Sequence, residues 1–160
     1  MKLARVLFLI SCMSVPGYSL NTVLTALDGA ITTTDALIVS LSATSPLDPT
    51  IKAEITNVVA PLPGISLMII TELSLNSPDS TRAGQINQWL VPVLTKLSNL
   101  SPTAKAIVGA TIRDWQIFLN VYPPTQSGAT KFSARALNNI QKHSVILNTH
   151  ATNMISMHYR

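Results

Sequence analysis

The sequence predicts an all-α protein, an antiparallel bundle of four to five helices, and three observations support this prediction. Apolar residues recur every three or four positions through most of the chain, as they do on one face of a helix. The string Leu-Ser-x-x-Ser-Pro occurs at residues 41–46, 73–78 and 97–102, and it combines signals that end one helix and begin the next. Dipeptides typical of tight hairpins are scarce, and Asp28-Gly29 is the single candidate.

Residues 1–19 have the layout of a secretory signal peptide. Lys2 and Arg5 precede a mostly apolar stretch, and small residues precede a predicted cleavage after Ser19. The apolar stretch of roughly ten residues is too short to span the hydrocarbon core of a membrane. We therefore expect a secreted, extracellular protein with a single helical-bundle domain, residues 20–160.

The remaining chain divides into windows with helical periodicity that open at proline or capping residues. The second window must break or kink near Pro61–Gly64, and the third contains Pro92. Each serine before a proline is expected to cap the helix that follows. The windows are residues 20–43, 48–75, 77–100, 101–122 and 130–158.

Two segments also fit β-structure, which is the alternative to the helical prediction. Residues 37–42 show alternation, and residues 65–70 are apolar and rich in β-branched side chains. Residues 32–34 are three threonines, which are poor helix-interior residues. The helical periodicity around these segments is longer, so we favour helices.

Composition indicates a fold held together by apolar packing. The chain is 47% hydrophobic and 11% charged, against a typical charged fraction of about 25%. Its one cysteine, Cys12, lies in the predicted signal peptide, so we expect a cysteine-free mature chain. That excludes a disulfide framework, a thiol nucleophile and a thiolate metal site. After residue 20 no apolar run of about 18 residues is free of proline or glycine, so we expect no stable transmembrane segment.

Charge is distributed unevenly along the chain. Residues 20–79 hold six acids and one base, whereas residues 80–160 hold eight bases and one acid. We expect the two halves to attract each other weakly in the folded bundle; a basic face for an anionic surface is the alternative. The bases form no run, and only two tryptophans lie among them, so we expect no nucleic-acid partner.

The carboxylates do not predict catalysis. On one helix Asp28 and Asp35 would share a face about 10 Å apart, too far to share a proton. Asp48 occupies an expected N-cap position, and Asp79 falls in the first turn after Pro78, where a negative charge matches the helix dipole. With no Gly-x-Ser-x-Gly elbow and no glycine-rich phosphate loop, we expect a protein that is not an enzyme and has no cofactor.

Two further motifs invite a chemical interpretation. On a continuous helix His150, Met154 and His158 follow at four-residue steps, a ladder that could suit Cu(I). Packing on an apolar stripe is the stronger reading, so we expect no metal site. Asn99-Leu100-Ser101 is the only N-glycosylation sequon and lies in a predicted turn, although Pro102 and a capping role for Ser101 compete with modification.

The apolar excess carries the functional hypothesis. Helices that are apolar over a broad arc can hold a fatty ligand between them or open onto an apolar surface. A signal peptide before a cysteine-free helical domain resembles, in organisation, fungal hydrophobic-surface-binding proteins and cell-wall mannoproteins. We expect a secreted, non-enzymatic protein that binds a lipid, a fatty acid or an apolar surface; an extracellular protein-interaction or structural module without a small-molecule ligand is the alternative. The predicted ligand-binding residues are Leu62, Ile65, Met68, Ile69, Leu90, Val93, Trp115 and Leu119.

Overall fold

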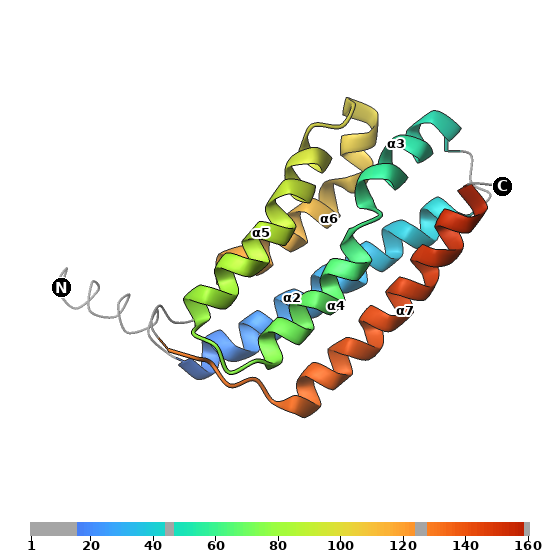
Figure 1. Ribbon diagram of the computed structural model, residues 1–160. Coiled ribbons are helices and arrows are strands. Elements are labelled where there is room, and N and C mark those ends of the chain that lie inside the picture. The colour runs from blue at the N-terminus through green and yellow to red at the C-terminus, as the bar shows by residue number, and fades with distance from the viewer. Residues whose placement is uncertain (1–15, 44–46, 124–127, 159–160) are drawn as a thin grey trace, which may run out of the picture.

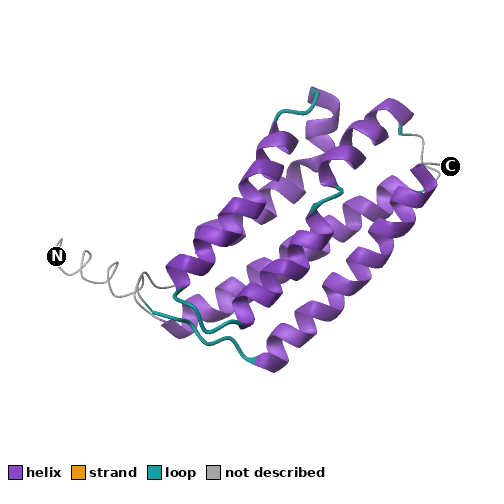
Figure 2. Cartoon of the chain, viewed as in Figure 1, coloured by secondary structure: helices purple, strands orange, loops and turns teal. Residues whose placement is uncertain are grey.

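The computed structural model describes residues 16–43, 47–123 and 128–158, and every regular element in those ranges is a helix (Figures 1 and 2). The two segments that also fitted β-structure lie inside helices. The predicted signal peptide falls largely on residues 1–15, outside the described residues, and a cleavage after Ser19 would fall within the first helix. The helices are α2 (Pro16–Ser42), α3 (Pro49–Val59), α4 (Leu62–Ser74), α5 (Asp79–Ser98), α6 (Pro102–Val121) and α7 (Ala134–His158).

The helices pack side by side in a closed ring. α2 packs on α7, α7 on α4, α4 on α5, α5 on α6, and α6 returns to α2. α3 continues roughly the line of α4 and packs on α5 and α6 near the turn that joins them (Figure 1). The apolar core therefore fills the centre of the ring, with fully buried side chains from α2 through α7, among them Leu27, Ile69, Leu90, Trp115 and Leu147.

We expected neighbouring helices to be antiparallel, but α2 and α7 are not. Asp28 pairs with His143 and Asp35 with His150, so both helices advance by seven residues in the same direction and α2 and α7 are parallel (Figure 1). The pairing of α4 with α7 runs in the opposite sense, because Ser66 meets Ser144 while Pro63 meets Asn148. In a ring of five rods that alternate in direction, the first and the last must be parallel.

The Leu-Ser-x-x-Ser-Pro strings end helices where predicted. α2, α4 and α5 end at Ser42, Ser74 and Ser98, the second residue of each string. The starts follow less closely: α6 begins at Pro102 and α5 one residue after Pro78, but α3 begins at Pro49.

The predicted serine caps are wrong for the helices that follow Pro78 and Pro102. The N-cap of α5 is Pro78 itself, and Ser101 at the N-cap of α6 makes no capping bond. Its hydroxyl instead donates to Glu54 Oε1 of α3, at 2.6 Å. Asp48 is the capping residue that was predicted correctly, since its carboxylate accepts from the Thr50 amide at 2.7 Å.

Prolines shape two helices differently. Near Pro61–Gly64 the chain breaks as predicted, and α3 ends before α4 begins. Pro92 lies inside α5, which continues past it for six residues. Proline lacks the backbone N–H that would bond the carbonyl four residues earlier. Because Pro92 is exposed, water can bond that carbonyl instead.

Two of the three threonines of residues 32–34 join α2 to α6. Thr34 is fully buried; its hydroxyl donates to Ala30 O and accepts from Trp115 Nε1 at 2.8 Å. The Thr33 hydroxyl lies 2.5 Å from Asp114 Oδ2. Residues that weaken an isolated helix thus supply the polar contacts between two packed helices.

Candidate functional site

The eight predicted ligand-binding residues lie on three helices and belong mostly to the packed core. Leu62, Ile69, Leu90 and Trp115 are fully buried, and Ile65 and Val93 are each 8% exposed. Leu119 packs against the core in a partly buried position. Met68 differs from the others, because 40% of its surface is exposed on α4.

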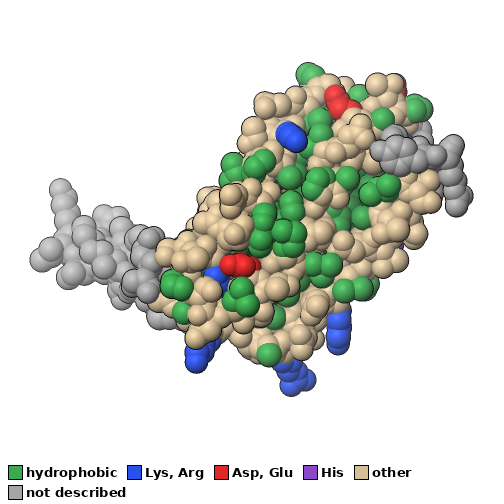
Figure 3. All heavy atoms as spheres, viewed as in Figure 1, with side chains coloured by type: hydrophobic (Ala, Val, Ile, Leu, Met, Phe, Trp, Pro, Cys, Tyr) green, Lys and Arg blue, Asp and Glu red, His purple; other side chains and the backbone are tan. Residues whose placement is uncertain are grey.

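The outer side of α4 carries no charge from Leu62 to Thr71, and Glu72, near the end of the helix, is half-buried. No charged residue occurs between Glu54 and Glu72, a stretch that includes nearly all of α4. Met68 is exposed and Leu67 half-buried on this helix. In the space-filling view, hydrophobic side chains gather over the middle of the face to which α4 belongs (Figure 3). This uncharged part of the helix, with its exposed thioether, can contact an apolar molecule without leaving a charge desolvated.

α4 is attached differently on its two sides. Towards α7, Ser66 Oγ lies 2.5 Å from Ser144 Oγ, and Asn148 Nδ2 donates to Pro63 O at 2.8 Å. Towards α5, the hydrogen bonds given by the described residues are confined to one end, where Arg82 donates to Leu73 O and Leu75 O. Most of the α4–α5 interface is therefore held by non-directional apolar contact.

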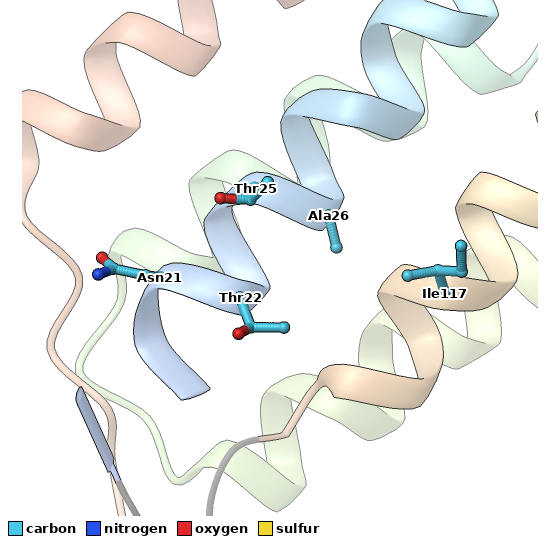
Figure 4. A pocket seen from close by; sticks show the side chains of 5 residues that line it. All are labelled: Asn21, Thr22, Thr25, Ala26 and Ile117. Atoms are coloured by element: carbon cyan, nitrogen blue, oxygen red, sulfur yellow. The ribbon is translucent and has the colours of Figure 1, made fainter. Parts of the chain in front are cut away.

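A surface hollow of about 360 Å³ lies between α2 and α6, and we call it the α2–α6 hollow. Ala26 of α2 and Ile117 of α6 face each other across it (Figure 4). Asn21, Thr22 and Thr25 complete its lining. It includes none of the eight predicted residues, and periodicity could not have found it, because it lies at the edge of an interface.

The histidines of α7 pair with the acids of α2, which the sequence analysis did not predict. His143 Nδ1 lies 2.6 Å from Asp28 Oδ1, and His150 Nδ1 lies 2.6 Å from Asp35 Oδ1. Both spacings are seven residues, and this equality was the available signal. Met154 is buried in the core, as expected for packing, while the structure of His158's side chain lies outside the described residues.

A second hollow, of about 250 Å³, lies between these two pairs, and we call it the α2–α7 hollow. Its lining consists of Ile31, Thr32, Asp35, His143 and Ile146. Among the described residues, no group of three or more His, Cys, Asp or Glu side chains is placed to hold a metal ion. The hollow therefore combines two apolar side chains with a carboxylate, an imidazole and a hydroxyl group.

Asp79 lies in the first turn of α5, as predicted, but its surroundings were not predicted. It is fully buried and ion-paired with Arg82, which is also fully buried. The Thr130 amide and hydroxyl donate to the Asp79 carboxylate at 2.9 and 2.5 Å, and Arg82 Nη2 donates to Thr130 O. We call these residues, with Tyr122 and Phe132, the Asp79 cluster; Arg82 lies 5.6 Å from the centre of the Phe132 ring.

The Asp79 cluster also changes the ionisation of a tyrosine. Burial raises the pKa of the Tyr122 phenol far above its ordinary value, an increase that Arg82 opposes and the Asp79 carboxylate reinforces. The Tyr122 hydroxyl lies 3.5 Å from Asp79 Oδ1. The cluster ties together the ends of α4 and α6, the start of α5 and the segment before α7, and its charged side chains are buried.

The predicted glycosylation residue, Asn99, is exposed at the end of α5. The serine of its sequon is engaged by Glu54, whose second carboxylate oxygen lies 3.4 Å from the Ser101 amide. Glu54 thereby places a negative charge at the start of α6, where the helix dipole favours it.

Two stretches are long and apolar enough to cross a membrane, by length and composition only. They are Asn21–Ser42 and Pro49–Ser74, with mean hydropathies of 1.3 and 1.5. Core helices of a bundle meet the same criterion, and these windows are 39% and 50% buried against the rest of the protein. They are weak evidence for a membrane-spanning segment.

Comparisons with protein-family models, curated proteins and solved structures found no match to this chain.

Proposed function

We propose that this protein binds an apolar ligand, such as a fatty acyl chain or another apolar surface, along α4 and without catalysing a reaction. The observation that carries the proposal is the uncharged part of α4 before Glu72, with Met68 exposed on it. Beneath that surface lie Ile65 and Ile69, two of the residues predicted to contact the ligand.

The attachment of α4 supports a route for the ligand. The α4–α5 interface is apolar over most of its length, and its polar contacts are at the Arg82 end. The break between α3 and α4 lies at the opposite end. Separation of α4 from α5 at the break would give an acyl chain access to Ile65, Ile69, Leu90 and Val93, and each methylene transferred from water would contribute about 0.8 kcal/mol.

Ligand titration tests this proposal directly. We expect a long-chain fatty acid to change the fluorescence of half-buried Trp89, which precedes Leu90 on α5. Mass spectrometry of an organic-solvent extract of the purified protein should identify a stoichiometric lipid. Empty extracts together with no saturable fluorescence change would refute the proposed function.

Three lysine substitutions locate the ligand. Met68→Lys places a charge on the outer side of α4 and should weaken binding about tenfold, about 1.4 kcal/mol. Val39→Lys is the matched control, because Val39 is 46% exposed on α2, outside both hollows. If Ile117→Lys weakens binding and Met68→Lys does not, the ligand occupies the α2–α6 hollow and the α4 assignment is wrong.

We also propose that the protein is exported and works outside the cell as a single-domain helical bundle. The sequence of residues 1–19 supports this proposal. Expression of the full chain in a secreting host, followed by N-terminal sequencing of the medium, should give a product that starts at Leu20. Retention of an uncleaved chain in the cell would contradict export.

A further inference from the structure

The α2–α7 hollow has the composition of a small ligand site. Ile31 forms a fully buried apolar wall, and Ile146 contributes a second, 49% exposed wall. Asp35 and His143, which belong to different acid–histidine pairs, supply the ionisable part of the lining, and Thr32 adds a hydroxyl group. Apolar walls with a few convergent polar groups are typical of small-molecule sites.

The two acid–histidine pairs determine which atoms remain for a ligand. His150 occupies Oδ1 of Asp35, which leaves Oδ2 as an acceptor among the contacts of the described residues. The Asp28 carboxylate can only accept, so His143 Nδ1 carries the hydrogen that lies between them. In the neutral ring, Nε2 of His143 is then also an acceptor. Asp35 and His143 therefore both favour a ligand that donates.

The surrounding charge favours a cation. α2 contains Asp28 and Asp35 and no lysine or arginine. On α7 the nearest fixed cation in sequence is Lys142, an exposed residue that does not line the hollow. A metal ion fits poorly, because the described residues offer no set of three ligating side chains and the hollow has isoleucine walls.

We propose that the α2–α7 hollow binds a small protonated primary amine with a compact apolar body. The ammonium group donates to Asp35 Oδ2 and His143 Nε2, and the apolar body packs against Ile31 and Ile146. This site is separate from α4, so it stands or fails independently of the function proposed above.

Three probes with the same aromatic body test the ligand chemistry. Isothermal titration of the full chain should show saturable binding of phenethylamine. Phenethyl alcohol lacks the charge-assisted hydrogen bond, so its affinity should be lower by a factor of at least about ten. Phenylacetate should not bind. Equal binding of all three probes would refute recognition of the ammonium group.

A matched pair of variants separates ligand contact from helix pairing. Asp35→Asn keeps the shape of the side chain but removes its charge, and should weaken phenethylamine binding about tenfold or more. His150→Gln disrupts the same acid–histidine pair but retains the Asp35 carboxylate, so binding should persist. Circular dichroism of both variants checks the fold.

Two results would overturn the proposal. One is equal loss of binding in Asp35→Asn and His150→Gln with both variants folded, because the pairing and not the carboxylate would then be responsible. The other is displacement of phenethylamine by an equimolar amount of Zn²⁺, with zinc binding abolished in His143→Gln. That result would assign the hollow to a metal ion.

Discussion

The Asp79 cluster and the two acid–histidine pairs each join a carboxylate to a basic side chain, but they lie in opposite environments. Asp79 and Arg82 have side-chain exposures of 0% and 1% and join four segments of the chain. The side chains of Asp28 and His143 are 38% and 52% exposed, and those of Asp35 and His150 are 28% and 39% exposed. Each of these pairs joins only α2 and α7.

This difference teaches that the number of ion pairs is a poor guide to their importance. A buried charge that loses its partner stays desolvated, so its removal is costly even where the intact pair adds little net stability. A half-exposed pair is screened by water, and either partner can be solvated when the other is removed. Four predictions test the contrast.

Arg82→Met should have the largest effect. It leaves the Asp79 carboxylate buried without its cation, and we expect a loss of about 3–5 kcal/mol in the free energy of unfolding. Urea denaturation followed by circular dichroism measures the change. The double variant Asp79→Leu, Arg82→Met removes both charges and should be less destabilised than Arg82→Met alone. A greater loss in the double variant would indicate that the pair itself stabilises the fold.

Thr34→Val should have an intermediate effect because it concerns a buried but neutral contact. It leaves Trp115 Nε1 without its acceptor at a fully buried position. The expected destabilisation is about 1–3 kcal/mol. Thr71→Val is the matched control, since Thr71 also bonds a carbonyl four residues earlier but is exposed. Equal destabilisation of the two variants would contradict a specific role for Thr34.

Tyr122 makes the stability of the Asp79 cluster depend on alkaline pH. Because its pKa is raised in the folded protein, its contribution to stability is fully present below the ordinary pKa near 10 and is lost as the pH rises above that value. The loss should be on the order of 1 kcal/mol per pH unit above about pH 10. Unfolding measured at several alkaline pH values should show a steeper decline in the wild type than in Tyr122→Phe. Parallel curves would rule out this contribution.

His150→Gln should have the smallest effect on stability. The His150–Asp35 pair is partly exposed and screened by water, so the free energy of unfolding should fall by less than about 1 kcal/mol. Thermal unfolding of this variant beside Arg82→Met compares the two environments in one experiment. A loss as large as that of Arg82→Met would show that exposure does not separate the two regions.

The sequence predicted the helix ends and the Asp48 cap correctly because local chemistry determines them. Helices end at Ser42, Ser74 and Ser98 since each is followed within four residues by a proline that cannot continue a helix. The N-cap formed by the Asp48 carboxylate and the helix break near Pro61 also depend on residues a few positions away.

The sequence did not reveal features that depend on distant segments. Asp79 and Arg82 look like an ordinary pair on a helix surface, and their burial requires Thr130 and Phe132 to fold back over them from about fifty positions away. The two hollows likewise lie between helices whose relative register is set by packing. Residues 32–34 illustrate the same limit, because their poor helix propensity is outweighed by contacts with α6.

The parallel course of α2 and α7 has a mechanical consequence. The start of α2 and the end of α7 lie at opposite ends of the bundle (Figure 1). Tension applied between those points would act in shear, dragging one helix along the other instead of peeling them apart turn by turn. Resistance to stretching would then be shared along the whole length of both helices.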